Sequence, residues 1–172
     1  FSLEESFSIH LNLPPHRLQS PALVDDLLAV INTEGLDATK LVLEITEGSI
    51  VADSAVTTRS MDQLKSYGVR LAIDDFGTGY SSLAYLKTFP INTLKIDKSF
   101  LDDYQSNSGS VFIDTMVRMA HNLHISVVAE GVESQEQLDY LDSIQCECYQ
   151  GYFCSNPVPK QEFIQLVQKL NT

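Results

Sequence analysis

The feature that most constrains this chain is a regular alternation of strand-like and helix-like segments. The first strand-like segment, Ser6–Leu13, places Phe7, Ile9 and Leu11 on one face, which is the period of two expected for a β-strand. We predict the other strands at Leu41–Glu47, Val69–Asp75, Thr93–Asp97, Ser126–Glu130 and Cys146–Gln150. We predict helices opening at Ser20-Pro21 and closing at Gly35, and then at Ser54–Tyr67, Ser82–Lys87, Ser110–Leu123, Ser134–Ile144 and Pro159–Leu170. Strands that alternate with helices run parallel, so the pattern predicts an α/β fold, either an open doubly wound sheet or a barrel.

Length and charge limit the classes of partner. The 172 residues fit one domain, and 23 acidic residues against 11 basic ones give a formal net charge of −12. We therefore expect no nucleic acid polymer as a partner, because no basic surface would neutralise its phosphates. A small phosphorylated ligand would need metal ions to supply the missing positive charge.

Two further patterns bear on location. No apolar run approaches the roughly 20 residues of a membrane span and no signal peptide is present, so we expect a cytoplasmic segment without membrane contact. Membrane segments of a parent protein would lie outside this sequence. The three cysteines, Cys146, Cys148 and Cys154, lack the spacing of a zinc site and are interpreted as reduced core residues.

Polar residues recur at the carboxyl ends of the predicted strands. They are Asn12, Glu44, Asp74, Asp75, Lys95, Asp97, Glu130 and Gln150. In a parallel barrel these ends meet at one mouth, where active sites are built. Taken alone, Asp74-Asp75 before Phe76-Gly77 also fits a solvated turn, but agreement across every strand favours a shared site.

The candidate cluster has the composition of a hard-cation site. Asn12, Glu44, Asp74, Asp75 and Glu130 offer only oxygen atoms, which favours Mg²⁺ or Mn²⁺ over Zn²⁺. Two such ions form the usual clamp for attack of water on a phosphodiester. Lys95 has two interpretations, a residue that orients the attacking water or a Schiff-base lysine; nearby acids favour the first because they keep the ammonium protonated.

The histidines and tyrosines carry less information. We interpret His10, His16, His121 and His124 as residues without a ligand role. Three tyrosines, Tyr80, Tyr149 and Tyr152, fit either stacking on a base or partial burial.

Six motifs resemble, in order and spacing, those of the EAL family. They are Asn12-Leu13, Leu43-Glu44-Ile45-Thr46-Glu47, Asp74-Asp75-Phe76-Gly77-Thr78-Gly79, Leu94-Lys95-Ile96-Asp97, Val128-Ala129-Glu130-Gly131-Val132-Glu133 and Gln150-Gly151-Tyr152. The family consists of bacterial phosphodiesterases that hydrolyse the second messenger cyclic di-GMP to linear pGpG. The resemblance implies a modified (β/α)₈ TIM-type barrel, of which residues 1–172 would be a single EAL-type domain holding about six of the eight strand–helix units.

The resemblance also assigns roles residue by residue. Asn12, Glu44 and Asp74 are similar to ligands of a first metal, and Asp74, Asp75 and Glu130 to the surroundings of a second. Lys95 resembles the residue that contacts the attacking water, and Glu130 is expected to be catalytic as well. Glu47 resembles the acid that holds the Asp75–Leu83 loop. Glu133, Gln150 and Asp97 correspond to polar walls of the substrate pocket. Two Mg²⁺ or Mn²⁺ ions are expected in the intact domain.

The Glu-Ala-Leu strand that names the family is absent from this sequence. We therefore expect a domain that is incomplete at its N-terminus, inactive as a segment, and prone to associate as a homodimer or through exposed faces. Covalently linked sensory domains are expected in a parent protein. The alternative function is a catalytically silent module that binds cyclic di-GMP and signals to a partner.

Overall fold

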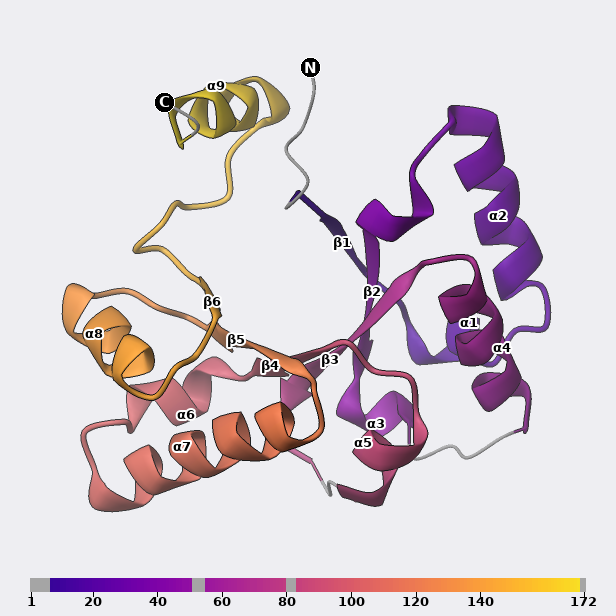
Figure 1. The fold of residues 1–172 in the computed structure, drawn as a ribbon. Coiled ribbons are helices and arrows are strands. Elements are labelled where there is room, and N and C mark those ends of the chain that lie inside the picture. The colour runs from indigo at the N-terminus through magenta and orange to yellow at the C-terminus, as the bar shows by residue number, and fades with distance from the viewer. Residues whose placement is uncertain (1–6, 51–54, 80–82, 171–172) are drawn as a thin grey trace.

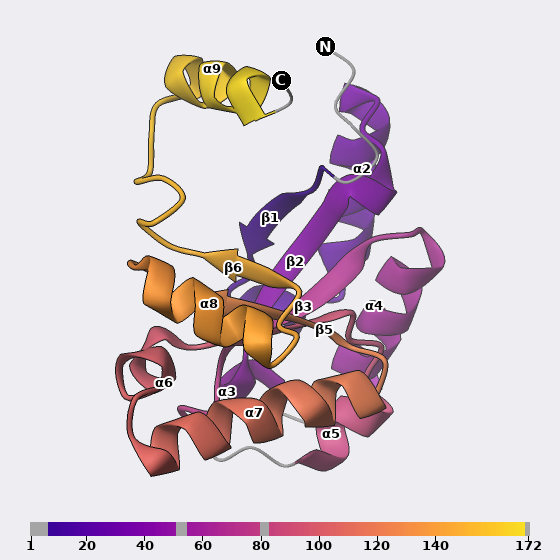
Figure 2. The same cartoon turned by 60° about the vertical axis from the view of Figure 1, so that its left-hand side comes forward.

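A computed structural model describes residues 7–50, 55–79 and 83–170 of the chain. Its strands form one sheet in the order β1-β2-β3-β4-β5-β6, and every neighbouring pair is parallel. The strands are β1 (Ile9–Asn12), β2 (Leu41–Thr46), β3 (Arg70–Phe76), β4 (Thr93–Ile96), β5 (Ser126–Glu130) and β6 (Cys148–Gln150). The sheet curves into a half-barrel, as Figures 1 and 2 show. The predicted α/β class and the six parallel strands of a barrel are confirmed.

The helices that follow the strands lie around the outside of this half-barrel (Figure 1). They are α1 (Pro15–Leu18), α2 (Leu23–Glu34), α3 (Glu47–Ile50), α4 (Ala55–Ser66), α5 (Leu83–Thr88), α6 (Lys98–Asp102), α7 (Asn107–Asn122), α8 (Gln135–Ser143) and α9 (Lys160–Leu170), with a short 3₁₀ turn η1 (Ala38–Lys40). In both views α9 stands apart from the other helices, above β1. The ring of Phe163 in α9 lies 6.2 Å from that of Phe7, measured between ring centroids.

The core fills the space between the sheet and its helices. Leu43 and Ile45 of β2 belong to the same buried cluster as Met61 and Leu64 of α4. Because strand side chains alternate, the residues between them point to the concave interior of the half-barrel. This alternation decides which polar side chains can meet.

β1, at one edge of the sheet, exposes apolar side chains. Ile9 and Leu11 of β1 keep 46% and 47% of their surface exposed, as expected for the first strand of this segment. Leu11 and Leu13 line a cavity of about 210 Å³ together with Leu23 and Leu27 of α2. Apolar residues at a sheet edge favour association, but the structure does not test that prediction.

Several predicted boundaries are wrong, most of them where a short helix follows a strand. Ser20-Pro21 does not open α2, because the helix begins at Leu23 and Ser20 Oγ accepts only from the Ala22 amide, 3.3 Å away. The sequence pattern predicts strand positions for Glu47 and Asp97, but Glu47 is the first residue of α3 and Asp97 is the N-cap of α6. Ser6, Ser54 and Ser82, the first residues of three predicted elements, lie outside the described residues.

Other predictions hold in part. Gly35 ends α2 in the left-handed conformation, with φ 64°. The cysteines are free, as expected, but only Cys146 is buried, while Cys148 and Cys154 are exposed. Burial raises the pKa of the Cys146 thiol to about 11. Within the described residues, no helix is long and apolar enough to cross a membrane.

Candidate functional site

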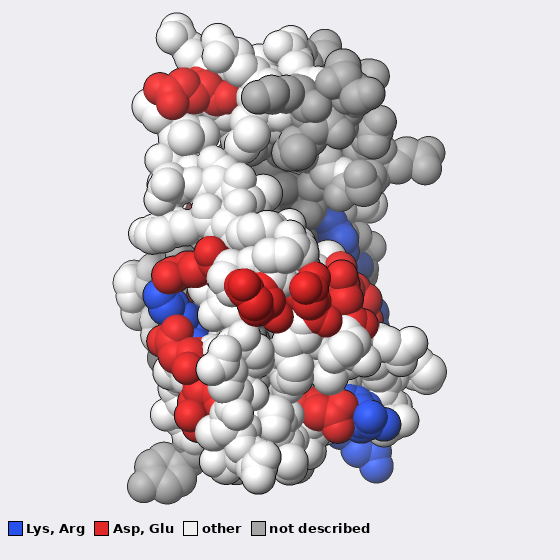
Figure 3. Space-filling view, turned by 90° about the vertical axis from the view of Figure 1, so that its left-hand side faces the viewer, with Lys and Arg blue, Asp and Glu red and all other residues white. Residues whose placement is uncertain are grey.

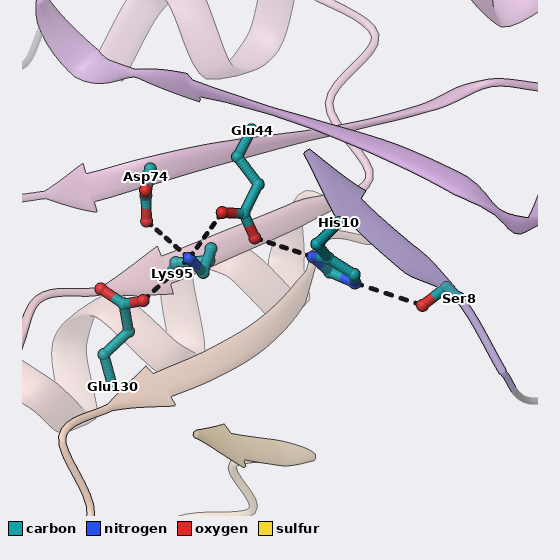
Figure 4. A network of polar contacts seen from close by, with 6 residues as sticks. All are labelled: Ser8, His10, Glu44, Asp74, Lys95 and Glu130. Atoms are coloured by element: carbon teal, nitrogen blue, oxygen red, sulfur yellow. Dashed lines mark hydrogen bonds and ion pairs between the residues drawn. The ribbon is translucent and has the colours of Figure 1, made fainter. Parts of the chain in front are cut away.

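Four charged side chains from four adjacent strands meet inside the half-barrel. Lys95 Nζ lies 3.0 Å from Glu44 Oε2, 2.8 Å from Asp74 Oδ1 and 2.8 Å from Glu130 Oε1. Figure 4 shows the three carboxylates pointing from their strands toward this one ammonium group. Lys95 is 4% exposed and Glu44 is 8% exposed, so the cluster lies largely out of solvent. The sequence-based prediction that strand-end residues converge is confirmed for these four side chains.

Strand alternation explains the convergence. Leu94 and Ile96 flank Lys95 in β4 and belong to the buried apolar cluster, as do Val127 and Ala129 in β5. Lys95 and Glu130 therefore project to the opposite face of the sheet, into the concave interior. The parallel register brings the strand ends level, since Lys95 is paired with Val128 and Glu130 with Gln150.

Asp75 breaks this alternation and adds a further carboxylate. Adjacent strand residues normally point to opposite faces, yet oxygens of Asp74, Asp75 and Glu130 all lie within 4.8 Å of one another. The register between β3 and β4 shifts between Ile73 and Phe76, and Asp75 has φ 54°. A bulge with one residue in the left-handed region redirects the chain, and Asp tolerates that region better than most residues. The bulge thus turns two successive carboxylates toward one space.

The charges in the cluster shift each other's titration. Burial alone would lower the pKa of Lys95, but hydrogen bonds to Asp74, Glu130 and Glu44 raise it above its ordinary value. Burial, together with repulsion from Asp74 and Asp75, raises the pKa of Glu130 although Lys95 acts in the opposite direction. Burial and the neighbouring Asp74 and Asp97 raise the pKa of Asp75. These acids share the single ammonium group of Lys95, so the remaining repulsion among them favours the binding of an additional cation.

One face of the molecule carries mostly negative charge. On the face shown in Figure 3, acidic side chains are spread across the middle, with few basic ones. This agrees with the formal net charge of −12. An anionic ligand would approach such a surface more readily after cations had bound.

His10 is a site residue that the sequence analysis missed. Its Nδ1 atom lies 2.8 Å from Glu44 Oε1, and its Nε2 atom lies 3.2 Å from Ser8 Oγ (Figure 4). The sequence analysis gave His10 no ligand role, and the structure adds a hydrogen bond to Glu44 that the sequence did not indicate. Burial raises the pKa of Glu44, but the hydrogen bonds from His10 and Lys95 outweigh it, so the pKa is below its ordinary value. The only signal in the sequence was the shared strand face of His10 and Asn12.

Glu47 holds the glycine-rich loop after β3. Its Oε2 atom accepts a hydrogen bond from the Gly77 amide at 3.0 Å, and its side chain is buried. Gly77 has φ 96°, and a Cβ atom there would lie 2.7 Å from the Phe100 ring. A Cβ atom on Gly79 would lie 3.0 Å from Glu47 Oε1. The two glycines thus let the loop backbone approach both neighbours.

The remaining candidates lie around this cluster with different contacts. Asp97 Oδ1 accepts from the Ser99 amide at 3.0 Å as the cap of α6. Glu133 pairs with Lys98, whose Nζ atom is 2.5 Å from Glu133 Oε1. Asn12 pairs in register with Glu44, and both Asn12 and Gln150 are exposed. Tyr149 and Tyr152 are 37% and 63% exposed, and Tyr80 lies outside the described residues.

Comparison with known proteins shows which family this chain resembles. The EAL domain family matches residues 2–157, which is most of the chain. The chain belongs to the EAL domain family. A relative, the cyclic di-GMP phosphodiesterase NbdA of Pseudomonas aeruginosa, is 40% identical over 156 residues, covering 90% of this chain and 20% of that protein. The chain spans between 19% and 25% of the curated relatives it matches.

Solved EAL structures share the fold. The MucR phosphodiesterase of Pseudomonas aeruginosa, in complex with c-di-GMP, has a TM-score of 0.87 and 32% identity, over 93% of this chain and 65% of that one. BlrP1 of Klebsiella pneumoniae, in a manganese and c-di-GMP complex, has a TM-score of 0.81 and 32% identity, over 87% of this chain and 39% of that one. The six-stranded half-barrel is thus part of an EAL barrel fold.

Proposed function

We propose that this EAL chain is part of a domain that hydrolyses cyclic di-GMP to linear pGpG with Mg²⁺ or Mn²⁺. The observation that carries the proposal is the cluster of Glu44, Asp74 and Glu130 around buried Lys95, with Asp75 beside it. Such a cluster is costly to fold unless cations bind there. The names of NbdA and of the MucR and BlrP1 complexes support the choice of substrate.

The donor set fits a hard divalent cation. Asp74, Asp75 and Glu130 offer carboxylate oxygens within 4.8 Å of one another. We assign Asn12, Glu44, Asp74, Asp75 and Glu130 as the residues that would hold two ions. Carboxylate and amide oxygens are the ligands that Mg²⁺ and Mn²⁺ prefer. When bound, these ions supply charge neutralisation and a water of lowered pKa.

Lys95 has the properties of an orienting cation. Its three carboxylate partners raise its pKa, so the ammonium stays protonated and is a poor amine nucleophile. We assign Lys95 to hold and polarise the attacking water beside Glu130. The same pKa direction argues against the Schiff-base role that the sequence left open.

The other residues shape the pocket. We assign Glu47 to hold the Gly77–Gly79 loop, and Glu133, Gln150 and Asp97 to the substrate walls. The cap that Asp97 makes to α6 and the Lys98 partner of Glu133 would fix both carboxylates in place. We further propose that residues 1–172 belong to one domain joined to others in a longer signalling protein, since relatives extend well beyond the matched region.

A turnover assay tests the proposal. The protein, within its full-length chain, is incubated with cyclic di-GMP and Mg²⁺ or Mn²⁺, and the products are separated by chromatography. We expect pGpG, no product with a chelator, and a loss of at least about 100-fold in kcat for Asp75→Asn. Asp114→Asn, at a half-buried carboxylate on α7 paired with Arg118, is the matched control and should keep full activity.

Two results would contradict the proposal. Tight binding of cyclic di-GMP without any product would favour the silent signalling module. Turnover of Asp75→Asn close to the wild-type value would remove Asp75 from the cation site.

A further inference from the structure

His10 lies beside the carboxylate cluster and contacts it through Glu44. It sits in β1, two residues before Asn12 and therefore on the same face of the strand. In the register of β1 and β2, His10 is paired with Val42, and its side chain reaches past that position to Glu44. Figure 4 shows the imidazole ring on the side of Glu44 away from Lys95.

The contact leaves Glu44 with a partner on each oxygen. Oε1 is 2.8 Å from His10 Nδ1, and Oε2 is 3.0 Å from Lys95 Nζ. The two partners come from β1 and β4, on either side of the strands that hold Glu44 and Asp74. Lys95 is shared with two other carboxylates, whereas His10 contacts only Glu44 among the acids of the cluster. His10 is thus the group that acts on Glu44 alone.

The chemistry of this contact fixes the ring. The Glu44 carboxylate accepts hydrogen bonds, so the Nδ1 atom that lies 2.8 Å from its Oε1 atom is the donor and carries the proton. In a neutral imidazole the other nitrogen, Nε2, is then an acceptor, and Ser8 Oγ at 3.2 Å can donate to it. The chain Ser8–His10–Glu44 therefore sets both the tautomer and the direction of the Nδ1–H bond.

We propose that His10 is a positioning residue of the cation site, which holds the Glu44 carboxylate through Nδ1–H while Ser8 fixes the ring. The inference rests on the proposed function, since it takes Glu44 as a cation ligand. Groups that hydrogen-bond a metal ligand from outside typically change metal affinity by about 10–100-fold when removed. His10 itself need not touch the ion or the substrate.

Calorimetric titration of the full chain with Mn²⁺ tests this role without an activity assay. His10→Leu removes the donor and keeps the bulk, and it should weaken Mn²⁺ binding by about 10–100-fold. His10→Asn places an amide N–H near the position of Nδ1, so its affinity should stay close to that of the wild-type protein. His16→Leu, an exposed histidine on α1, is the matched control and should change nothing.

The outcomes separate this inference from the proposed function. Wild-type protein that binds no Mn²⁺ would contradict the cation site itself. Wild-type binding with an unchanged His10→Leu affinity would overturn the role of His10 alone. An equal loss in His10→Leu and His10→Asn would also overturn it, because a donor at the Nδ1 position would then not suffice.

A spectroscopic measurement covers the case in which His10→Leu fails to fold. ¹⁵N chemical shifts of the wild-type imidazole, recorded well above the ordinary histidine pKa, report which nitrogen carries the proton. We expect a protonated Nδ1 and an unprotonated Nε2 for His10. Diamagnetic Mg²⁺ takes the place of Mn²⁺ in this measurement, and we expect the Nδ1 signal of the Mg²⁺-saturated protein to differ from that of the chelated protein. The opposite tautomer would overturn the proposal.

Discussion

Lys95 is the residue that makes the cluster compatible with a stable fold. A buried ammonium surrounded by Glu44, Asp74 and Glu130 offsets part of the repulsion among the acids. Removing one partner of a buried ionic network leaves uncompensated charge, which is far more costly than losing an exposed pair. The stability of the site and its proposed chemistry therefore depend on the same side chain.

Lys95→Met should lower the free energy of unfolding by about 3–5 kcal/mol when measured in a chelator, because three carboxylates lose their shared cation. Urea denaturation monitored by circular dichroism measures the change. Lys98→Met is the matched control, since Lys98 and Glu133 form a pair with both side chains nearly half exposed. A Lys95→Met effect as small as the control effect would show that Lys95 does not stabilise the cluster.

At the scale of elements, a hydrogen bond ties the described part of the loop after β3 to α3. The Gly77 amide donates to Glu47, which begins α3, and the two segments are 30 residues apart in the chain. A glycine-rich loop has little side-chain packing of its own, so local opening is inexpensive. We therefore expect Glu47 to set the order of this loop.

Glu47→Ala should accelerate hydrogen exchange at Gly77 by about tenfold or more, the effect of losing a hydrogen bond to a charged acceptor. Exchange of β2 and β5 should be unchanged, because their backbone bonds are made within the sheet. Glu34→Ala, at the exposed end of α2, serves as the control. Unchanged protection of Gly77 in Glu47→Ala would refute the role of Glu47 in ordering the loop.

Elements with a local signal and the meeting of strand-end residues could be predicted from the sequence, but the register between strands could not. Ser126–Glu130 was predicted with its observed limits, and Ser134 caps α8 with Gln137 in a capping box. The bulge at Asp75 depends on the pairing of β3 with β4, and the bond between His10 and Glu44 depends on the register of β1 with β2. Each register relates two separate strands, so it cannot be predicted from either segment of sequence alone. Short helices such as α3 and α6 lack enough residues to show a helical period.

At the scale of the whole molecule, one parallel sheet brings together site residues that are far apart in the chain. Asp74, Asp75 and Glu130 come from β3 and β5, and Glu44 and Lys95 from the strands beside them. The site residues need not lie in one stretch of sequence, because the parallel strands that carry them end at the same edge of the sheet. The account as a whole therefore depends on these acids forming one cation site.

Calorimetric binding of Mn²⁺ to wild-type protein and to Asp75→Asn tests that claim most directly. We predict that wild-type protein binds Mn²⁺, that Asp75→Asn weakens the affinity by more than about tenfold, and that Asp114→Asn leaves it unchanged. Free Mn²⁺ at a concentration 100 times its Kd should also stabilise the wild-type fold by about 2.7 kcal/mol. Equal affinities for the wild-type protein and Asp75→Asn, or no binding to either, would contradict the account.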